Sequence, residues 1–312
     1  MDYNNLLSNA FTLSWKHKVL WVLGFFATST SYFGVANRLI PDKPDLWNFD
    51  IEGGFFQGVI DWFRFNPEIS IALIIFIVAM VLLLLLIFFI FSLISIAGLI
   101  DGVYKIEKNE SIKLSQLFKT GAAHFWRFLG LFLIAVVVGI TFAVLIILPI
   151  VLAFIMTPVV GVLALLIGIP IGFGGIFFFG NIYSLAQREI VAFGSPVFQA
   201  IGEGYTLLIK HVGPNLVIFL IGFFLEIVLI IGATVIILLF AVPIVFMSTY
   251  STWILVASII IILPLFLMIA IVIEGLLGTF FSSLITLFYL ELRKLSPKQV
   301  IPPASDPATA QS

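Results

Sequence analysis

The chain alternates between long apolar runs and shorter stretches in which apolar residues recur every three or four positions. The long runs exceed the roughly 20 residues that cross about 30 Å of hydrocarbon as a helix. Lipid offers the peptide backbone no hydrogen-bond partners, so such runs are expected to be α-helices. The pattern predicts six membrane helices, near residues 19–36, 69–100, 128–154, 158–183, 214–247 and 253–290.

A segment too polar to span a membrane precedes each pair of predicted helices. The three segments are LLSNAFTLSWKHK from Leu6, KLSQLFKTGAAHFWRF from Lys113 and SPVFQAIGEGYTLLIKHV from Ser195. Apolar residues three and four apart share one helical face. In these segments they are Leu6, Leu7, Ala10, Phe11 and Trp15; Leu114, Leu117, Phe118, Ala122, Phe125 and Trp126; and Phe198, Ile201, Tyr205, Leu208 and Val212. We expect three amphipathic helices lying in the plane of the membrane surface.

Short internal matches predict that the chain is built from three copies of one unit. LPIVLAF and VPIVFM place Pro149 and Pro243 alike, and a second proline follows each after the same interval, at Pro170 and Pro264. QLFKTG and QAIGEG match within the second and third surface segments. We therefore predict an all-α integral membrane protein of six transmembrane helices, arranged as three repeats of an amphipathic in-plane helix plus a helical hairpin.

The repeats occupy about residues 1–105, 106–190 and 191–294, within a single polytopic membrane domain, 1–294. The Pro-, Ser- and Ala-rich end, 295–312, has no apolar pattern and is expected to be disordered. The loop between the first two spans, 37–68, is acidic and rich in aromatic residues. We expect it on the outer side of the membrane, with its aromatic rings at headgroup depth.

Composition agrees with this reading. Of 312 residues, 62% are apolar and 10% charged, and the mean hydropathy is +1.25, far outside the range of water-soluble domains. Most lysines and arginines fall in the N-terminal segment, in two of the inter-helix links and near the C-terminal end. The positive-inside rule then places both termini in the cytoplasm, which predicts a multi-pass protein of the inner (cytoplasmic) membrane. A net charge of −1 gives no sign of nucleic-acid binding.

Catalytic signatures such as HExxH, GxSxG, GxxxxGK[ST] and CxxC are absent, so we expect no enzyme and no cofactor. Two acids stand inside apolar runs, Glu226 and Glu274, at equal distances from the STYST turn at Ser248. An acid within a span costs about 2.5–3.5 kcal/mol, so a pair at one depth needs an explanation. One is an intramembrane polar site that also includes Asn181. The other is that each helix is simply long, and its carboxylate reaches the inner interface or bonds a neighbouring Ser, Thr or Asn.

The three histidines, His17, His124 and His211, lie where a surface segment meets a span. A zinc site would need them to converge, and a Ca²⁺ site in the acidic loop fits no known spacing, so we predict no metal. The nearby basic residues Lys18, Arg127 and Lys210 are better explained as contacts to anionic lipid headgroups.

KHKVLW at Lys16, followed by two further units of the same form, resembles uncharacterised bacterial six-span membrane proteins. These in turn resemble the membrane domain attached to some glycerophosphodiester phosphodiesterases. The catalytic domain of those enzymes has no counterpart here, so the resemblance implies no activity and no site residues.

Two functions remain open on the sequence. The leading one is a non-enzymatic membrane protein that organises membrane lipids or a partner protein. The alternative is a carrier for a lipid-like or small amphiphilic solute that uses the intramembrane carboxylate pair.

Overall fold

The computed structural model describes residues 2–28, 65, 67–248 and 252–296, and the secondary structure within these ranges is helical. The helices are α1 (Tyr3–Lys16), α4 (Pro67–Glu107), α5 (Leu114–Met156), α6 (Pro158–Phe193), α7 (Val197–Lys210), α8 (Val212–Ser248) and α9 (Thr252–Leu295), with a short apolar helix, Val19–Thr28, after α1. Five of them, α4, α5, α6, α8 and α9, contain segments long and apolar enough to cross a membrane. The chain is thus a membrane-embedded, multi-pass helical protein.

Some expectations lie outside the described residues. The structure covers the first predicted span, 19–36, only as far as Thr28. Most of the acidic loop, the centre of the STYST turn and the C-terminal tail beyond Ser296 fall outside as well. Six spans and three copies therefore stay predictions.

Local sequence explains several helix ends. The Asp2 carboxylate accepts hydrogen bonds from the backbone amides of Asn4 and Asn5, at 3.1 and 3.2 Å, which caps α1. Between α5 and α6, the Thr157 hydroxyl accepts from the Val160 amide at 3.3 Å, and Pro158 occupies the first turn of α6. Gly194, with φ +63°, ends α6 in the left-handed conformation that glycine adopts without strain. The helical hairpin predicted from the spans 128–154 and 158–183 is thus present as α5 and α6.

The helices extend beyond the predicted spans on the side away from the hairpin turns. α4 runs to Glu107, α6 to Phe193 and α9 to Leu295, whereas predicted spans end at 100, 183 and 290. α5 is also continuous, so the break expected between a surface helix and a span near residue 128 is not present. No proline lies near residue 128 to interrupt α5. After α7, by contrast, Pro214 lacks the amide that a continuous helix would need.

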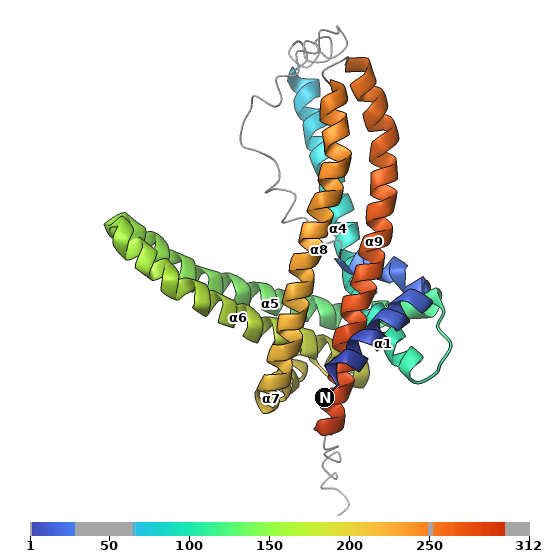
Figure 1. Cartoon of the computed structure of the whole chain (residues 1–312), viewed down its shortest axis with the longest axis vertical. Helices are drawn as coiled ribbons and strands as arrows, with labels where there is room; N and C mark the ends of the chain where they lie inside the picture. The colour runs from blue at the N-terminus through green and yellow to red at the C-terminus, as the bar shows by residue number, and fades with distance from the viewer. Residues whose placement is uncertain (1, 29–64, 66, 249–251, 297–312) are drawn as a thin grey trace, which may run out of the picture.

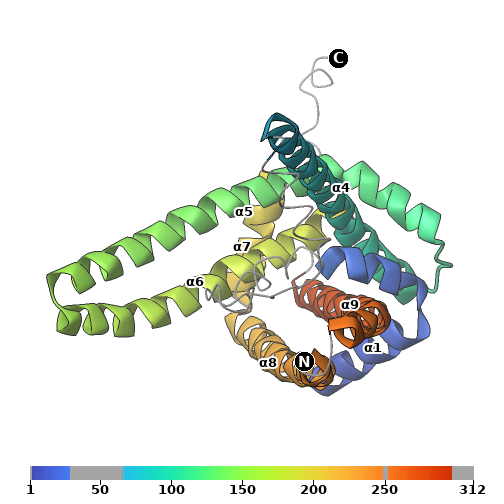
Figure 2. The same cartoon turned by 90° about the horizontal axis from the view of Figure 1, so that it is seen from above.

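Figures 1 and 2 show that α4, α8 and α9 run in roughly the same direction, whereas the α5–α6 hairpin points away to one side. All these helices meet at one end, where α1 and α7 also lie. We call this meeting place the junction. The arrangement differs from a single parallel bundle, because the α5–α6 hairpin diverges from the other long helices.

Buried side chains concentrate in the junction. Leu20, Leu99, Leu117, Leu185 and Phe288, from five different helices, all belong to one buried cluster. Beyond the junction the helices are largely uncovered: large apolar side chains are exposed along α4 from Ile69 to Phe88, on nearly every face of the helix. Apolar surface of that extent is expected where lipid, rather than water, is the solvent.

The short helix α1, the first part of α5 and α7 each pack against one long helix. α1 packs on α9, α5 on α4, and α7 on α6. If the three helices are aligned at their first residues, Ala10, Gly121 and Gly204 fall at one position, and all three are buried. The QLFKTG–QAIGEG match gives the same alignment for α5 and α7.

Glycine residues allow the backbones of these packed helices to approach each other closely. A Cβ added to Gly121 would collide with the carbonyl oxygen of Ile94, and one added to Gly204 would lie 3.0 Å from that of Ile182. In both pairs the helices touch through backbone atoms, a mode of packing that small residues allow in membrane proteins. Gly24 makes a similar close approach to α9 at Gly275.

Candidate functional site

A buried ionic network ties α6, α7 and α9 together at the junction. The Glu189 side chain, on α6, is wholly buried. Its carboxylate accepts hydrogen bonds from the hydroxyl of Tyr289 and the guanidinium of Arg293, both on α9. Arg293 also pairs with Glu203 on α7, at 3.0 Å between Nη2 and Oε2. A buried carboxylate is stable only when paired in this way.

Helical spacing on α9 explains how the network forms. Tyr289 and Arg293 are four residues apart and share one face of the helix. Arg293 Nε donates to the Tyr289 hydroxyl at 3.1 Å. The same guanidinium lies 5.5 Å from the centre of the Phe193 ring, at the end of α6. These contacts orient the arginine towards Glu189.

Arg188, the neighbour of Glu189, is also buried, with 3% of its surface exposed. Its Nη1 donates to the backbone oxygen and the hydroxyl of Ser184, at 2.8 and 3.0 Å, and to the Gln187 side chain at 3.1 Å. Within the described residues, Arg188 Nε and the Tyr104 hydroxyl are buried without a hydrogen-bond partner. The Glu189 carboxylate accepts from the Ser195 hydroxyl as well, at 3.4 Å, in addition to Tyr289 and Arg293. A carboxylate paired in this way holds helices together.

Further polar contacts fasten other parts of the junction. The Thr279 hydroxyl lies 3.0 Å from the backbone oxygen of Leu20 and 2.8 Å from that of Gly275, which links α9 to the helix Val19–Thr28. His211 Nε2 lies 2.9 Å from the Ser296 hydroxyl. The end of α9 is therefore fixed to the α7–α8 connection as well as to α6.

The three residues predicted to form an intramembrane polar site lie on three helices. Glu226 is exposed on α8 and Glu274 is partly buried on α9. Asn181, on α6, donates from Nδ2 to the backbone oxygen of Phe177 at 2.7 Å. No hydrogen bond or ion pair joins any two of them in the part of the chain that the structure describes. The proposed polar site stays a prediction.

The predicted headgroup residues Lys18, Arg127 and Lys210 are all exposed. Lys18 Nζ lies 6.0 Å from the centre of the Trp21 ring. The Arg127 guanidinium lies beside Gly194 at the carboxyl end of α6, where the helix dipole stabilises a positive charge. Lys210 is the last residue of α7. Headgroup binding by these residues stays a prediction.

The histidines belong to separate contacts. His124 Nδ1 lies 2.9 Å from the backbone oxygen of Thr120, one turn earlier in α5, whereas His211 faces Ser296. Among residues 2–28, 65, 67–248 and 252–296, no group of three His, Cys, Asp or Glu side chains is placed to hold a metal ion.

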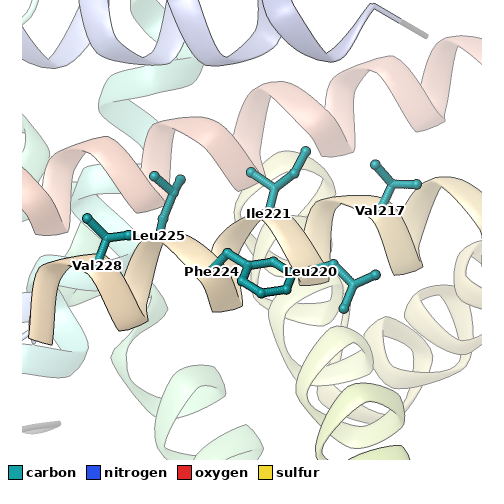
Figure 3. Close-up of a pocket in the computed structure, with 6 residues that line it drawn as sticks. All are labelled: Val217, Leu220, Ile221, Phe224, Leu225 and Val228. Atoms are coloured by element: carbon teal, nitrogen blue, oxygen red, sulfur yellow. The ribbon is translucent and has the colours of Figure 1, made fainter. Parts of the chain in front are cut away.

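An open hollow of about 410 Å³ runs along α8. Figure 3 shows its lining, which comes entirely from that helix: Val217, Leu220, Ile221, Phe224, Leu225 and Val228. None of these side chains carries a polar group, so the hollow cannot orient a polar solute. Its lining is wholly apolar.

The pattern of apolar residues does not predict the network of Glu189, Glu203, Tyr289 and Arg293. The predicted spans leave residues 184–213 as a link, although α6 continues through AQREIVAF to Phe193. One local signal was present: Arg188 and Glu189, adjacent and oppositely charged, interrupt an otherwise apolar stretch. The contacts themselves join residues about a hundred positions apart, and no short-range pattern records them.

No protein-family model matches the chain, and no curated protein or solved structure matches it either. The resemblance to the membrane domains of glycerophosphodiester phosphodiesterases stays a prediction.

Proposed function

We propose that this chain is a non-enzymatic protein of the inner (cytoplasmic) membrane that organises lipids around a rigid junction, or presents its helices to a partner protein. In this proposal the chain has six spans in three copies, and both termini are cytoplasmic. The matching burial of Ala10, Gly121 and Gly204 supports the three copies. The junction lies on the cytoplasmic side of the membrane in this proposal, since most Lys and Arg residues fall in the segments that meet at the junction.

The observation that carries the proposal is the contrast between the junction and the helices that leave it. The junction is held by buried ion pairs, close backbone contacts and a hydrophobic core. The helices beyond it expose apolar side chains on most faces along α4, α5, α6 and α8. A rigid base with uncovered apolar helices offers a large contact surface to acyl chains or to helices of another protein.

The carrier alternative gains no favouring observation. A carrier places polar groups around a shared site near the middle of the bilayer, commonly at broken helices. Here α6 and α9 continue through Pro170 and Pro264. Glu226 and Glu274 share no hydrogen bond in the described part of the chain.

Native mass spectrometry of the gently extracted protein tests the proposal. We expect the chain to carry bound phospholipid or a second protein through the extraction in a reproducible ratio. A bare chain under conditions that preserve lipid on other membrane proteins would overturn the proposal. A parallel assay in vesicles addresses the carrier: uptake or lipid movement that depends on pH and is lost in the double variant Glu226→Gln, Glu274→Gln would replace our proposal with the alternative.

A further inference from the structure

The alignment of α1, α5 and α7 at their first residues reveals a second shared feature, on the exposed side of the helices. α1 and α7 each have 14 residues and end in Lys16 and Lys210, both exposed. The aligned residue of α5 is Arg127, which is exposed too. A basic residue therefore occupies the same position in all three helices.

A large apolar residue precedes each of these bases and is exposed as well. Trp15, Trp126 and Ile209 expose 55%, 76% and 49% of their surface. In a water-soluble protein this exposure would be unfavourable at three positions at once. At the border between hydrocarbon and headgroups it is the expected arrangement, because tryptophan favours that depth and basic side chains reach up to the phosphates.

We propose that the pairs Trp15–Lys16, Trp126–Arg127 and Ile209–Lys210 are three equivalent anchors that bind the phosphate groups of anionic phospholipids in the cytoplasmic leaflet. The inference rests on the proposed function and names the class of lipid that the junction holds. The base aligned with Arg127 and Lys210 is Lys16. Lys18, whose Nζ lies 6.0 Å from the centre of the Trp21 ring, is outside the aligned position, and its contact with headgroups stays a separate prediction.

The structure indicates why the anchors surround the junction. In each helix the face that holds the pair is opposite to, or beside, the buried face: Leu6, Leu117 and Ala200 are buried at one aligned position, as are Ala10, Gly121 and Gly204 at another. Each anchor is thus held by a helix that packs on one long helix. Lipids bound at the anchors would be positioned beside the helices that leave the junction.

Spin-labelled lipids give a direct test. The full-length protein is reconstituted in phosphatidylcholine vesicles that contain spin-labelled phosphatidylglycerol or spin-labelled phosphatidylcholine. Electron paramagnetic resonance then gives the motionally restricted fraction and, from it, the ratio of the two association constants. We expect the wild-type protein to prefer phosphatidylglycerol severalfold, and the preference to fall at high salt, which screens exposed charges.

Variants assign the preference to the anchors. Each of Lys16→Gln, Arg127→Gln and Lys210→Gln should lower the measured ratio by less than about fivefold, because the ratio averages over all lipid sites, and the triple variant should bring it close to one. Arg127→Lys, which keeps the charge, should retain the preference. The matched control is the triple variant Lys108→Gln, Lys113→Gln, Lys119→Gln, which removes the same charge from exposed residues outside the anchors. We expect it to change the ratio less than twofold.

An equal loss in the control would overturn the proposal, because the preference would then follow net charge alone. No preference in the wild-type protein would overturn it as well. If the wild-type protein shows no preference but still restricts the motion of spin-labelled phosphatidylcholine, the proposed lipid-organising function stands without the anchors. Displacement of the labelled lipid by inorganic phosphate, beyond that caused by sodium chloride of the same ionic strength, would also contradict the proposal, because the anchors would then bind soluble phosphates.

Discussion

Glu189 depends on its partners more than any acid at the surface of the junction. Its carboxylate is wholly removed from solvent and lies between Tyr289 and Arg293. A charge in that position is costly once its counter-charge is removed, because the protein interior solvates it poorly. An exposed pair such as Lys294–Glu291, at 2.6 Å, contributes little, since water already solvates both groups.

We therefore expect Arg293→Met to lower the free energy of unfolding by about 3–5 kcal/mol. Lys294→Met, the control one residue away, should lower it by about 1 kcal/mol at most. The measurement is reversible unfolding in mixed micelles, followed by circular dichroism. Adding Glu189→Gln to Arg293→Met should restore part of the loss, because no unpaired charge then remains buried. Equal effects of Arg293→Met and Lys294→Met would show that Glu189 does not need its arginine.

At the scale of single residues, the sequence predicts exposure better than pairing. The bases Lys18, Arg127 and Lys210 were expected at a surface and are exposed. The pairing of Glu189 with Arg293 could not be predicted, because it depends on how α6 and α9 pack, and these residues are far apart in the chain. Side-chain direction on a short amphipathic helix such as α1 is equally hard to infer: Leu6 and Ala10 are buried, whereas Phe11 and Trp15, from the same predicted stripe, are exposed.

The helices themselves depend on close approach at a few glycines. In α5, Gly121 lies against the backbone of α4, whereas Gly139 has no neighbouring atom within 4 Å of an added Cβ. The two positions share one helix and the same small side chain. They differ only in what surrounds them, so they form a matched pair for substitution.

Alanine should have opposite effects at these two sites. Gly121→Ala forces the added methyl group against the Ile94 carbonyl oxygen, which we expect to lower the free energy of unfolding by about 1–3 kcal/mol. Gly139→Ala removes backbone freedom without a collision and should raise it by up to about 1 kcal/mol. The same unfolding assay measures both. Stabilisation by Gly121→Ala would contradict the close packing of α4 and α5.

At the scale of helices, the positions of the long elements follow from the apolar runs, and their ends do not. A helix does not have to end with its apolar run, because many polar residues are also good helix formers. For that reason α5 includes the segment expected as a separate surface helix, and α6 ends only at Gly194. α7 stays separate because Pro214 follows it within four residues. A prediction based on hydrophobic length alone places such boundaries at the limit of the bilayer instead.

The whole molecule raises the question of how the diverging α5–α6 hairpin meets a bilayer. α5 has 43 residues, or about 64 Å at ~1.5 Å per residue, roughly twice the thickness of the hydrocarbon. A helix of that length extends well beyond the membrane or lies at a steep tilt. The hairpin and the group of α4, α8 and α9 point in different directions (Figures 1 and 2), whereas the predicted topology has all of them crossing one membrane.

Cysteine labelling distinguishes these arrangements, and the chain suits the method because it contains no cysteine. We expect Lys119→Cys and Lys210→Cys to react with a membrane-impermeant maleimide only after the cells are opened, because the junction is cytoplasmic in the proposed topology. Met156→Cys, at the exposed tip of the α5–α6 hairpin, should react in intact cells. Reaction of all three only after opening would place the hairpin on the cytoplasmic leaflet without crossing. Reaction of Lys119→Cys and Lys210→Cys on opposite sides would contradict the threefold arrangement, because the first part of α5 and α7 would then not share a leaflet.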